Sequence, residues 1–141
     1  MMGYDSVFFS GEDDSAMVKQ ALAESRVILT RDTGVVRRRA VSSGRVKATL
    51  IESEEPERQM RQILTAFDLK AQSRPFTLCL ECNAPLESRS RQEMVGRVPP
   101  YVYRTQTQYM ECPNCHRVYW RGTHWAAMAR RLEKLADNVN D

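Results

Sequence analysis

A chain of 141 residues can form one ordinary domain or two small ones, and its 42% apolar content allows only a modest core. No apolar run approaches the roughly 20 residues of a membrane span, and no basic segment leads into an apolar one as in a secretion signal. We therefore expect a soluble, cytoplasmic protein without a membrane partner. The net charge is +3, and arginine, which binds phosphate through a planar fork, supplies 17 of the 21 basic residues.

The first half of the chain predicts helices and short strands in alternation. From Asp14 to about Glu24 apolar residues recur four apart, which predicts a helix with one apolar face. The run at 26–30 is short, apolar and β-branched, as in a buried parallel strand. Other expected elements are a short strand at 6–9, a brief helix through 35–39, a strand at 46–51 and a helix from Pro56 to about Phe67. The alternation predicts an α/β layer around a parallel sheet, with a boundary at 71–75.

The second half of the chain has a different character. Residues 76–78 lead into a first cysteine pair, and 118–120 form a strand that leaves a second one. We expect residues 98–103, Val-Pro-Pro-Tyr-Val-Tyr, to be extended, because the two prolines disfavour a helix. Thr123 is a suitable N-cap for a last helix. The buried stripe of that helix would consist of Trp125, Met128, Leu132 and Leu135.

All the cysteines fall into two C-x-x-C pairs, Cys79/Cys82 and Cys112/Cys115, with 29 residues between the pairs. Each pair can turn two thiolates to one side of a tight knuckle, and two knuckles make a tetrahedral site. Zinc suits four soft, anionic ligands that leave no open position for a substrate. Short strands around such a site predict a zinc ribbon with a structural zinc ion.

The cysteines have two other interpretations, a pair of disulfides and haem attachment. Disulfides would require an oxidising compartment, which nothing in this sequence indicates. The segment Cys112-Pro-Asn-Cys115-His116 matches the C-x-x-C-H pattern of haem attachment, but haem would leave the first pair without a role. Zinc explains all four thiols.

Asp14 and Asp32 are the candidate catalytic acids. Asp32 directly follows a predicted parallel strand, and ligands of open α/β sheets bind at the carboxyl ends of strands. Asp14 begins the preceding helix, so both carboxylates can reach one point if that helix packs on the sheet. Paired carboxylates there can hold Mg²⁺ or Mn²⁺, which activates water and stabilises charge on a phosphoryl oxygen. Alternatively, both residues only cap helices or turns.

Several segments together resemble the Mut-seven C-terminal RNase domain family, in which a PIN-like nuclease domain is fused to a zinc ribbon. They are 14–32, 76–86, Val98-Pro-Pro-Tyr-Val-Tyr103, Cys112-Pro-Asn-Cys115 and Arg117-Val-Tyr-Trp-Arg-Gly-Thr-His-Trp125. The resemblance implies a metal-dependent endoribonuclease in which Asp14 and Asp32 match two of the acidic positions that hold the divalent ion. It also implies that the four cysteines are the zinc ligands.

The sequence departs from that family at two places. His116 stands where the family usually has glycine, which can alter the turn of the second knuckle without removing a ligand. Family members also begin with a strand that carries the first acidic residue, followed by a helix ending in a Leu-Gly-Tyr-Asp-like sequence, and Met2-Gly3-Tyr4-Asp5 matches only that ending. We therefore expect a sheet without its inner strand and a weaker cation site. The chain would then be a fragment, a sequence with a misplaced start or a degenerate relative.

Basic residues near the predicted sites are the candidate RNA contacts: Arg31, Arg37, Arg38, Arg39, Arg121 and His124. Between Asn83 and Arg131, eight arginines and three acids give a local charge of about +5. Such charge suits nucleic acid, and it suits a solvated surface equally well. Trp120 and Trp125 can stack on bases or form the small core beside a knuckle.

The sequence therefore predicts an α/β fold. Residues 1–74 would form a PIN-like parallel sheet with flanking helices, truncated at its N-terminus, and 75–141 a zinc ribbon with a terminal helix. The expected function is hydrolysis of RNA phosphodiester bonds with Mg²⁺ or Mn²⁺ on Asp14 and Asp32. The alternatives are a catalytically inactive, zinc-dependent RNA-binding or scaffold module, and a ribbon that binds only proteins.

Overall fold

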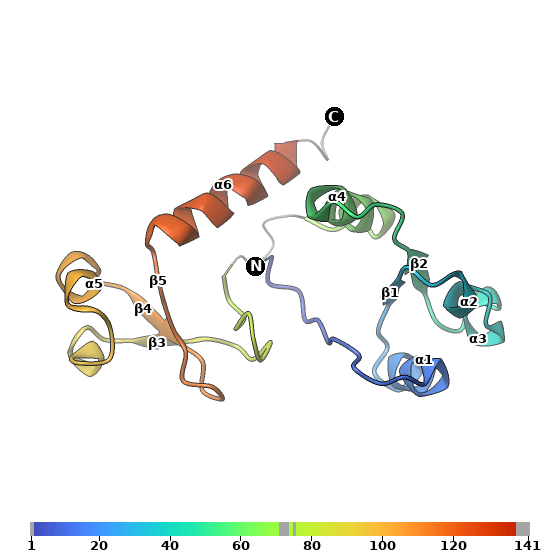
Figure 1. The fold of residues 1–141 in the computed structure, drawn as a ribbon, viewed down its shortest axis with the longest axis horizontal. Helices are drawn as coiled ribbons and strands as arrows, with labels where there is room; N and C mark the ends of the chain where they lie inside the picture. The colour runs from blue at the N-terminus through green and yellow to red at the C-terminus, as the bar shows by residue number, and fades with distance from the viewer. Residues whose placement is uncertain (1, 71–73, 75, 138–141) are drawn as a thin grey trace. The chain divides into compact units, whose positions relative to one another are not determined.

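The computed structural model describes residues 2–70, 74 and 76–137, and they form two compact units (Figure 1). One unit is Phe8–Leu69, and the other combines the residues before Phe8 with those after Leu69. Each unit contains one sheet, with two strands in the first and three in the second. Most of the expected boundary at 71–75 lies outside the described residues, and the division into domains at residue 74 stays a prediction.

The unit Phe8–Leu69 has the expected order of helices and strands. Its elements are α1 (Asp14–Ala23), β1 (Ile28–Thr30), α2 (Thr33–Val36), α3 (Arg39–Ser42), β2 (Ala48–Leu50) and α4 (Pro56–Ala66). The strands β1 and β2 pair in parallel, with Ile28 opposite Ala48. Between the strands the chain passes through α2 and α3, as a parallel pair requires a crossover connection. The predicted parallel α/β layer is confirmed.

The core of this unit is small and lies where α1, β1 and α2 meet. Its buried members are Val18, Ala21, Ile28, Val35 and Val46. These residues come from three separate elements and the approach to β2, so the cluster ties α1 and α2 to the sheet. Burying a few valine and isoleucine side chains contributes about 1.5–3 kcal/mol each.

Side chains fix the ends of the helices that flank the sheet. Asp13 caps α1 by accepting a hydrogen bond from the N–H of Ser15 at 2.7 Å. Pro56 occupies the first turn of α4, as expected for a residue without a backbone donor. Gln62 of α4 then reaches the sheet, donating to the carbonyl of Leu50 at 2.7 Å.

Two sequence predictions in this half are wrong. Residues 6–9 form no strand; the side chain of Phe8 is 91% exposed, and no described strand lies beside the segment to share its backbone hydrogen bonds. The single brief helix through 35–39 is instead two short helices, because Arg38 adopts an extended backbone at the start of α3.

The second unit is an antiparallel ribbon followed by a helix. Its elements are β3 (Glu87–Arg89), the 3₁₀ helix η1 (Gln92–Met94), α5 (Pro100–Thr105), β4 (Tyr109–Glu111), β5 (Val118–Trp120) and α6 (Thr123–Asp137). The strand order is β3-β4-β5, with Tyr109 of β4 opposite both Arg89 and Trp120. The core of this unit is a cluster of Met94, Val98 and Tyr109, in which the first two residues come from the segment between β3 and β4 and the third from β4.

The expectation of an extended segment at 98–103 is wrong, because α5 begins inside it. Pro99 is extended, with φ −55° and ψ 145°, and it stands at the N-cap of α5. Pro100 is then the first helical residue, where its missing N–H has no partner to lose. Two consecutive prolines therefore start a helix here instead of excluding one.

The last helix, α6, carries the predicted apolar stripe. Leu132 and Leu135 are buried, and Trp125 and Met128 are half-buried. The carbonyl of Gly122 accepts the N–H of Ala126 at 3.0 Å, so Gly122 and not Thr123 occupies the N-cap position. In the described part of the chain, no helix is both long and apolar enough to cross a membrane.

Candidate metal centre and acidic site

The two C-x-x-C pairs fold into knuckles with the same hydrogen-bond pattern. In the first knuckle the N–H of Asn83 bonds to the carbonyl of Cys79 at 2.9 Å; in the second, the N–H of His116 bonds to the carbonyl of Cys112 at 2.9 Å. Both closing residues adopt left-handed backbone, with φ of 56° at Asn83 and 57° at His116. Asparagine tolerates this conformation better than histidine does, and glycine best of all. The glycine preference noted at position 116 therefore has a backbone cause.

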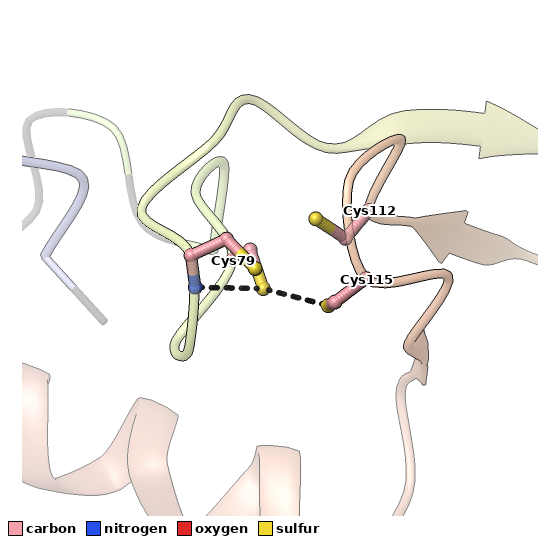
Figure 2. A group of neighbouring side chains, drawn as sticks. Cys79, Cys112 and Cys115 are labelled. Atoms are coloured by element: carbon pink, nitrogen blue, oxygen red, sulfur yellow. Dashed lines mark hydrogen bonds between the residues drawn. The ribbon is translucent and has the colours of Figure 1, made fainter.

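These knuckles bring the four cysteine sulfurs together. All four sulfurs lie within 4.8 Å of one another, and the sulfurs of Cys79 and Cys115 are 3.7 Å apart. A tetrahedral zinc site with Zn–S bonds of about 2.3 Å has edges of about 3.8 Å. Figure 2 shows Cys112 and Cys115 pointing from the β4–β5 loop toward Cys79. The four cysteines therefore form a metal-binding cluster whose donors and spacing fit zinc.

The geometry disfavours the other two interpretations of the cysteines. All four thiols are free of disulfides. The second pair, which carries the haem-like pattern, faces the first pair across the cluster, so a separate role for either pair is not needed.

Electrostatics at the cluster favour a bound cation. Burial opposes ionisation of Cys79, but hydrogen bonds from Tyr119 and from the knuckle backbone outweigh it and lower the pKa of Cys79 to about 6. The neighbouring Cys115, followed by burial and by Cys112, raises the pKa of Cys82 to about 12. Ionisation of one cysteine in this group thus opposes ionisation of its neighbours, because the negative charges repel one another. A bound divalent ion offsets that repulsion.

Tyr119 supports the cluster from β5, a role that the sequence analysis did not assign. Its oxygen accepts the N–H of Leu80 at 3.2 Å and lies 3.2 Å from the sulfur of Cys79. Because a thiolate only accepts, the Tyr119 hydroxyl must donate to it. Burial, with the nearby Cys79, raises the pKa of Tyr119 to about 12, so the hydroxyl keeps its proton.

Glu111 is a second residue whose role the sequence analysis missed. It is the residue before Cys112 and is only 4% exposed. Arg97 binds both of its oxygens, Arg89 donates from Nε at 2.6 Å, and Nδ1 of His116 lies 3.4 Å away. Hydrogen bonds from Arg97 and then Arg89 lower the pKa of Glu111 to about 2. Neither arginine is close to Glu111 in sequence, so spacing gives no signal for this network.

The two candidate acids lie at helix starts in the unit Phe8–Leu69. Asp14 is the first residue of α1, and its carboxylate pairs with Arg38 at 3.2 Å. Asp32 follows β1 and caps α2, accepting the N–H of Gly34 at 2.6 Å. Asp32 is therefore a helix cap, and its role in binding an ion stays a prediction. For Asp14, the cap of α1 is its neighbour Asp13.

Among the residues that the structure describes, neither Asp14 nor Asp32 belongs to a group of three or more potential metal ligands. Within the ranges that the structure describes, the four cysteines are the one group of three or more potential ligand side chains gathered at a point. Arg38 links the carboxylate of Asp14, at the start of α1, to the segment that follows Asp32. Asp14 and Asp32 as a pair stay a prediction.

Some of the predicted RNA-contact residues already pair with acidic side chains, and others do not. Arg31 pairs with Glu54 at 3.1 Å, and Arg38 contacts both Asp14 and Ser15. The remaining candidates, Arg37, Arg39, Arg121 and His124, are exposed. No acidic partner contacts any of these four among the described residues.

The chain joins a short parallel sheet with flanking helices to an antiparallel ribbon with a four-cysteine cluster. These features define an α/β protein with a zinc-ribbon-like metal centre. The family profile described as the Mut7-C RNAse domain matches residues 1–132, and the chain belongs to that family. The family expected from the sequence is thereby confirmed. Comparisons with curated proteins and with solved structures gave no significant match.

Proposed function

We propose that this protein is a metal-dependent endoribonuclease of the PIN type, which hydrolyses RNA phosphodiester bonds. The observation that carries the proposal is membership of an RNase domain family over residues 1–132. The acids expected from the sequence, Asp14 and Asp32, would hold Mg²⁺ or Mn²⁺. Two carboxylates suffice for such an ion when water and substrate phosphate complete its shell.

The local geometry supports these residue roles. In a helix–strand unit we expect the start of the helix and the carboxyl end of the strand to lie at the same edge of the sheet, which favours a shared site for both acids. Arg38 pairs with Asp14, and the residues on either side of Arg38 in the sequence, Arg37 and Arg39, are exposed. When bound, the ion would activate water and neutralise charge on the phosphate. The arginines would bind the phosphates on either side of the cleaved bond.

The zinc cluster has a supporting role in this proposal. It lies in the other unit and offers four thiolates, which leave a tetrahedral ion no open position for water or substrate. Its ion would hold the ribbon folded, and the ribbon would contribute RNA contacts.

A second candidate function is an inactive, zinc-dependent RNA-binding or scaffold module. Three observations favour it: Asp32 is engaged as a cap, Asp14 is engaged by Arg38, and neither belongs to a group of three potential metal ligands within the described residues. Fewer carboxylates bind a hard cation less tightly. Cleavage assays separate the two functions.

The decisive assay compares RNA cleavage by wild type, Asp32→Asn and Asp14→Asn in buffers with Mg²⁺, with Mn²⁺ and with neither. Asparagine remains a good N-cap, so Asp32→Asn keeps the bond to Gly34 and removes only the charge. We expect cleavage by wild type with either ion and a loss of at least about 100-fold in both variants.

Asp13→Asn is the matched control. It makes the same change of charge one residue before Asp14, at a position that caps α1. The control should cleave like wild type. Equal products from all four proteins, with or without added metal, would reject the nuclease proposal, and RNA binding without any cleavage would favour the inactive module.

A further inference from the structure

The ribbon unit contains an open groove of about 900 Å³, and the functions proposed above do not say where on the ribbon RNA would bind. Residues of the sheet and of α6 line it. Its apolar walls include Phe76, Trp120, Trp125 and Met128, and its charged side includes Arg121 and His124. Both tryptophans of the protein therefore lie in this one groove.

Arg121 is held in a position that suits phosphate binding. Its guanidinium carbon lies 5.1 Å from the centre of the Trp125 ring, and the ring of Phe76 lies 5.0 Å from that of Trp125. A guanidinium stacked on an indole keeps its N–H donors directed outward in the ring plane. Arg121 is exposed, and no described acid pairs with it. The donors of Arg121 thus lie beside the Trp125 ring and are available to an anion.

The charge around the groove indicates what that anion belongs to. Glu133 is the one acid among its lining residues, while Arg117, Arg121 and His124 lie on the same lining. Arg117 is engaged by Glu81 at 3.0 Å, which leaves Arg121 as the available positive charge next to the aromatic walls. An apolar, aromatic trough with a free arginine at its side matches a polymer that alternates flat bases with phosphates.

We propose that this groove binds single-stranded RNA, with bases against its aromatic and apolar walls and a phosphate on Arg121. Aromatic stacking of this kind tolerates every base, and a duplex hides its base faces. The groove would therefore hold unpaired RNA with little sequence preference. The choice of RNA over other single strands rests on the proposed function, while the groove itself does not depend on catalysis.

Tryptophan fluorescence provides a direct test because both indoles line the groove. The zinc-loaded full chain, carrying Asp32→Asn to prevent cleavage, is titrated with an oligouridylate of about 12 nucleotides. We expect saturable quenching and, with rising salt, a linear fall of log affinity against log salt. A duplex RNA of equal length should bind at least about tenfold more weakly to this groove.

Two variants localise the binding. Arg121→Gln should weaken oligouridylate binding about fivefold and reduce the salt slope by about 0.7, the value of one single-strand phosphate contact. Trp125→Phe should weaken binding about threefold to tenfold while Trp120 still reports it. Arg104→Gln, an exposed arginine of α5 outside the groove lining, is the matched control and should bind like the parent.

The outcomes separate this inference from the nuclease proposal. Absence of quenching, or equal affinity in Arg121→Gln and Arg104→Gln at full zinc content, overturns the groove as an RNA site even if wild type cleaves RNA. Quenching that is lost in Arg121→Gln supports the groove even if no protein in the cleavage assay is active. Tight binding of duplex RNA with no preference for the single strand would also overturn it.

Discussion

Arg89 of β3 donates from Nε to the carboxylate of Glu111 on β4 at 2.6 Å, one residue before the metal ligand Cys112. This contact joins the strand that follows the first knuckle to the strand that precedes the second. Arg97 completes the pairing from the connection between the two strands. The position of Cys112 thus depends on a buried ionic network as well as on the metal.

Glu111→Gln should destabilise the ribbon strongly. The substitution keeps the shape of the side chain but leaves Arg89 and Arg97 without their shared negative charge, and removing one partner of a buried ion pair costs more than the pair itself contributes. We expect the Tm of the zinc-loaded protein to fall by several degrees in thermal unfolding followed by circular dichroism. Glu87→Gln, whose carboxylate contacts Arg89 from an exposed position, is the control and should change the Tm little.

The pH dependence of Glu93 should reveal a capping box. Both the hydroxyl and the N–H of Ser90 donate to Glu93 Oε2 at 2.7 Å, and these bonds lower the pKa of Glu93 below its usual 4.5. A lowered carboxyl pKa adds stability above the unfolded value and loses it as pH falls through the folded value. NMR titration should place the Glu93 midpoint below 4.5, and Ser90→Ala should return it upward. An unchanged midpoint in Ser90→Ala would contradict the box.

His116→Gly should stabilise the protein by about 0.5–1 kcal/mol, because left-handed backbone strains any residue with a Cβ. The gain is measured as the difference in free energy of unfolding by denaturant at full zinc occupancy. The other histidine, His124, provides the matched control. It lies in α6, where glycine disfavours the helix, so His124→Gly should give no gain. Equal effects at both positions would argue against backbone strain as the cause.

Tyr119→Phe should weaken zinc binding about tenfold to 100-fold, the usual effect of losing a hydrogen bond to a ligand atom. The variant removes the donor to the Cys79 sulfur and leaves the ring in place. Competition with a chromophoric chelator measures the affinity. Tyr101→Phe, at an exposed hydroxyl of α5, should retain the affinity of wild type. Zinc affinity unchanged by Tyr119→Phe would remove Tyr119 from the metal site.

Chelation of zinc should unfold the ribbon and leave the unit Phe8–Leu69 folded. Without a cation the clustered cysteines cannot all ionise and no metal ion joins the two knuckles, whereas the other unit has its own core around Val18, Ile28 and Val35. NMR spectra recorded during titration with chelator should lose the dispersed ribbon signals first. Metal analysis should give one zinc per chain, and simultaneous loss of signals from both units would contradict separate folding.

The sequence predicted most reliably where chemistry restricts the spacing of residues. Two C-x-x-C pairs have few geometric solutions, so the cysteine cluster was foreseeable, and the apolar period of α4 and α6 likewise locates those helices. The sequence-based prediction failed where the same residue type is compatible with two local structures. Pro99 and Pro100 can block a helix or begin one, and the choice depends on whether Pro100 falls in the first turn.

The roles of Glu111 and Tyr119 depend on contacts between strands that are distant in sequence. Arg97 reaches Glu111 only because the chain between β3 and β4 folds back through η1 and α5. The spacing of these residues in the sequence does not predict that the chain folds back in this way. For the two candidate acids the sequence predicted part of the arrangement. It predicted their positions at the start of α1 and after β1, but it did not predict the contact between Arg38 and Asp14.

Tyr4 and Lys70 both belong to the ribbon unit and are joined by two hydrogen bonds. The Tyr4 hydroxyl donates to the carbonyl of Lys70 at 2.9 Å and accepts the N–H of Lys70 at 3.1 Å. The unit Phe8–Leu69 is an insertion in the sequence of the ribbon unit, and the contact between Tyr4 and Lys70 joins the chain shortly before this insertion to the chain directly after it. A short flexible loop of glycine and serine can replace such an insertion at small entropic cost. We therefore expect the ribbon to fold and to bind zinc when such a loop replaces residues 8–69.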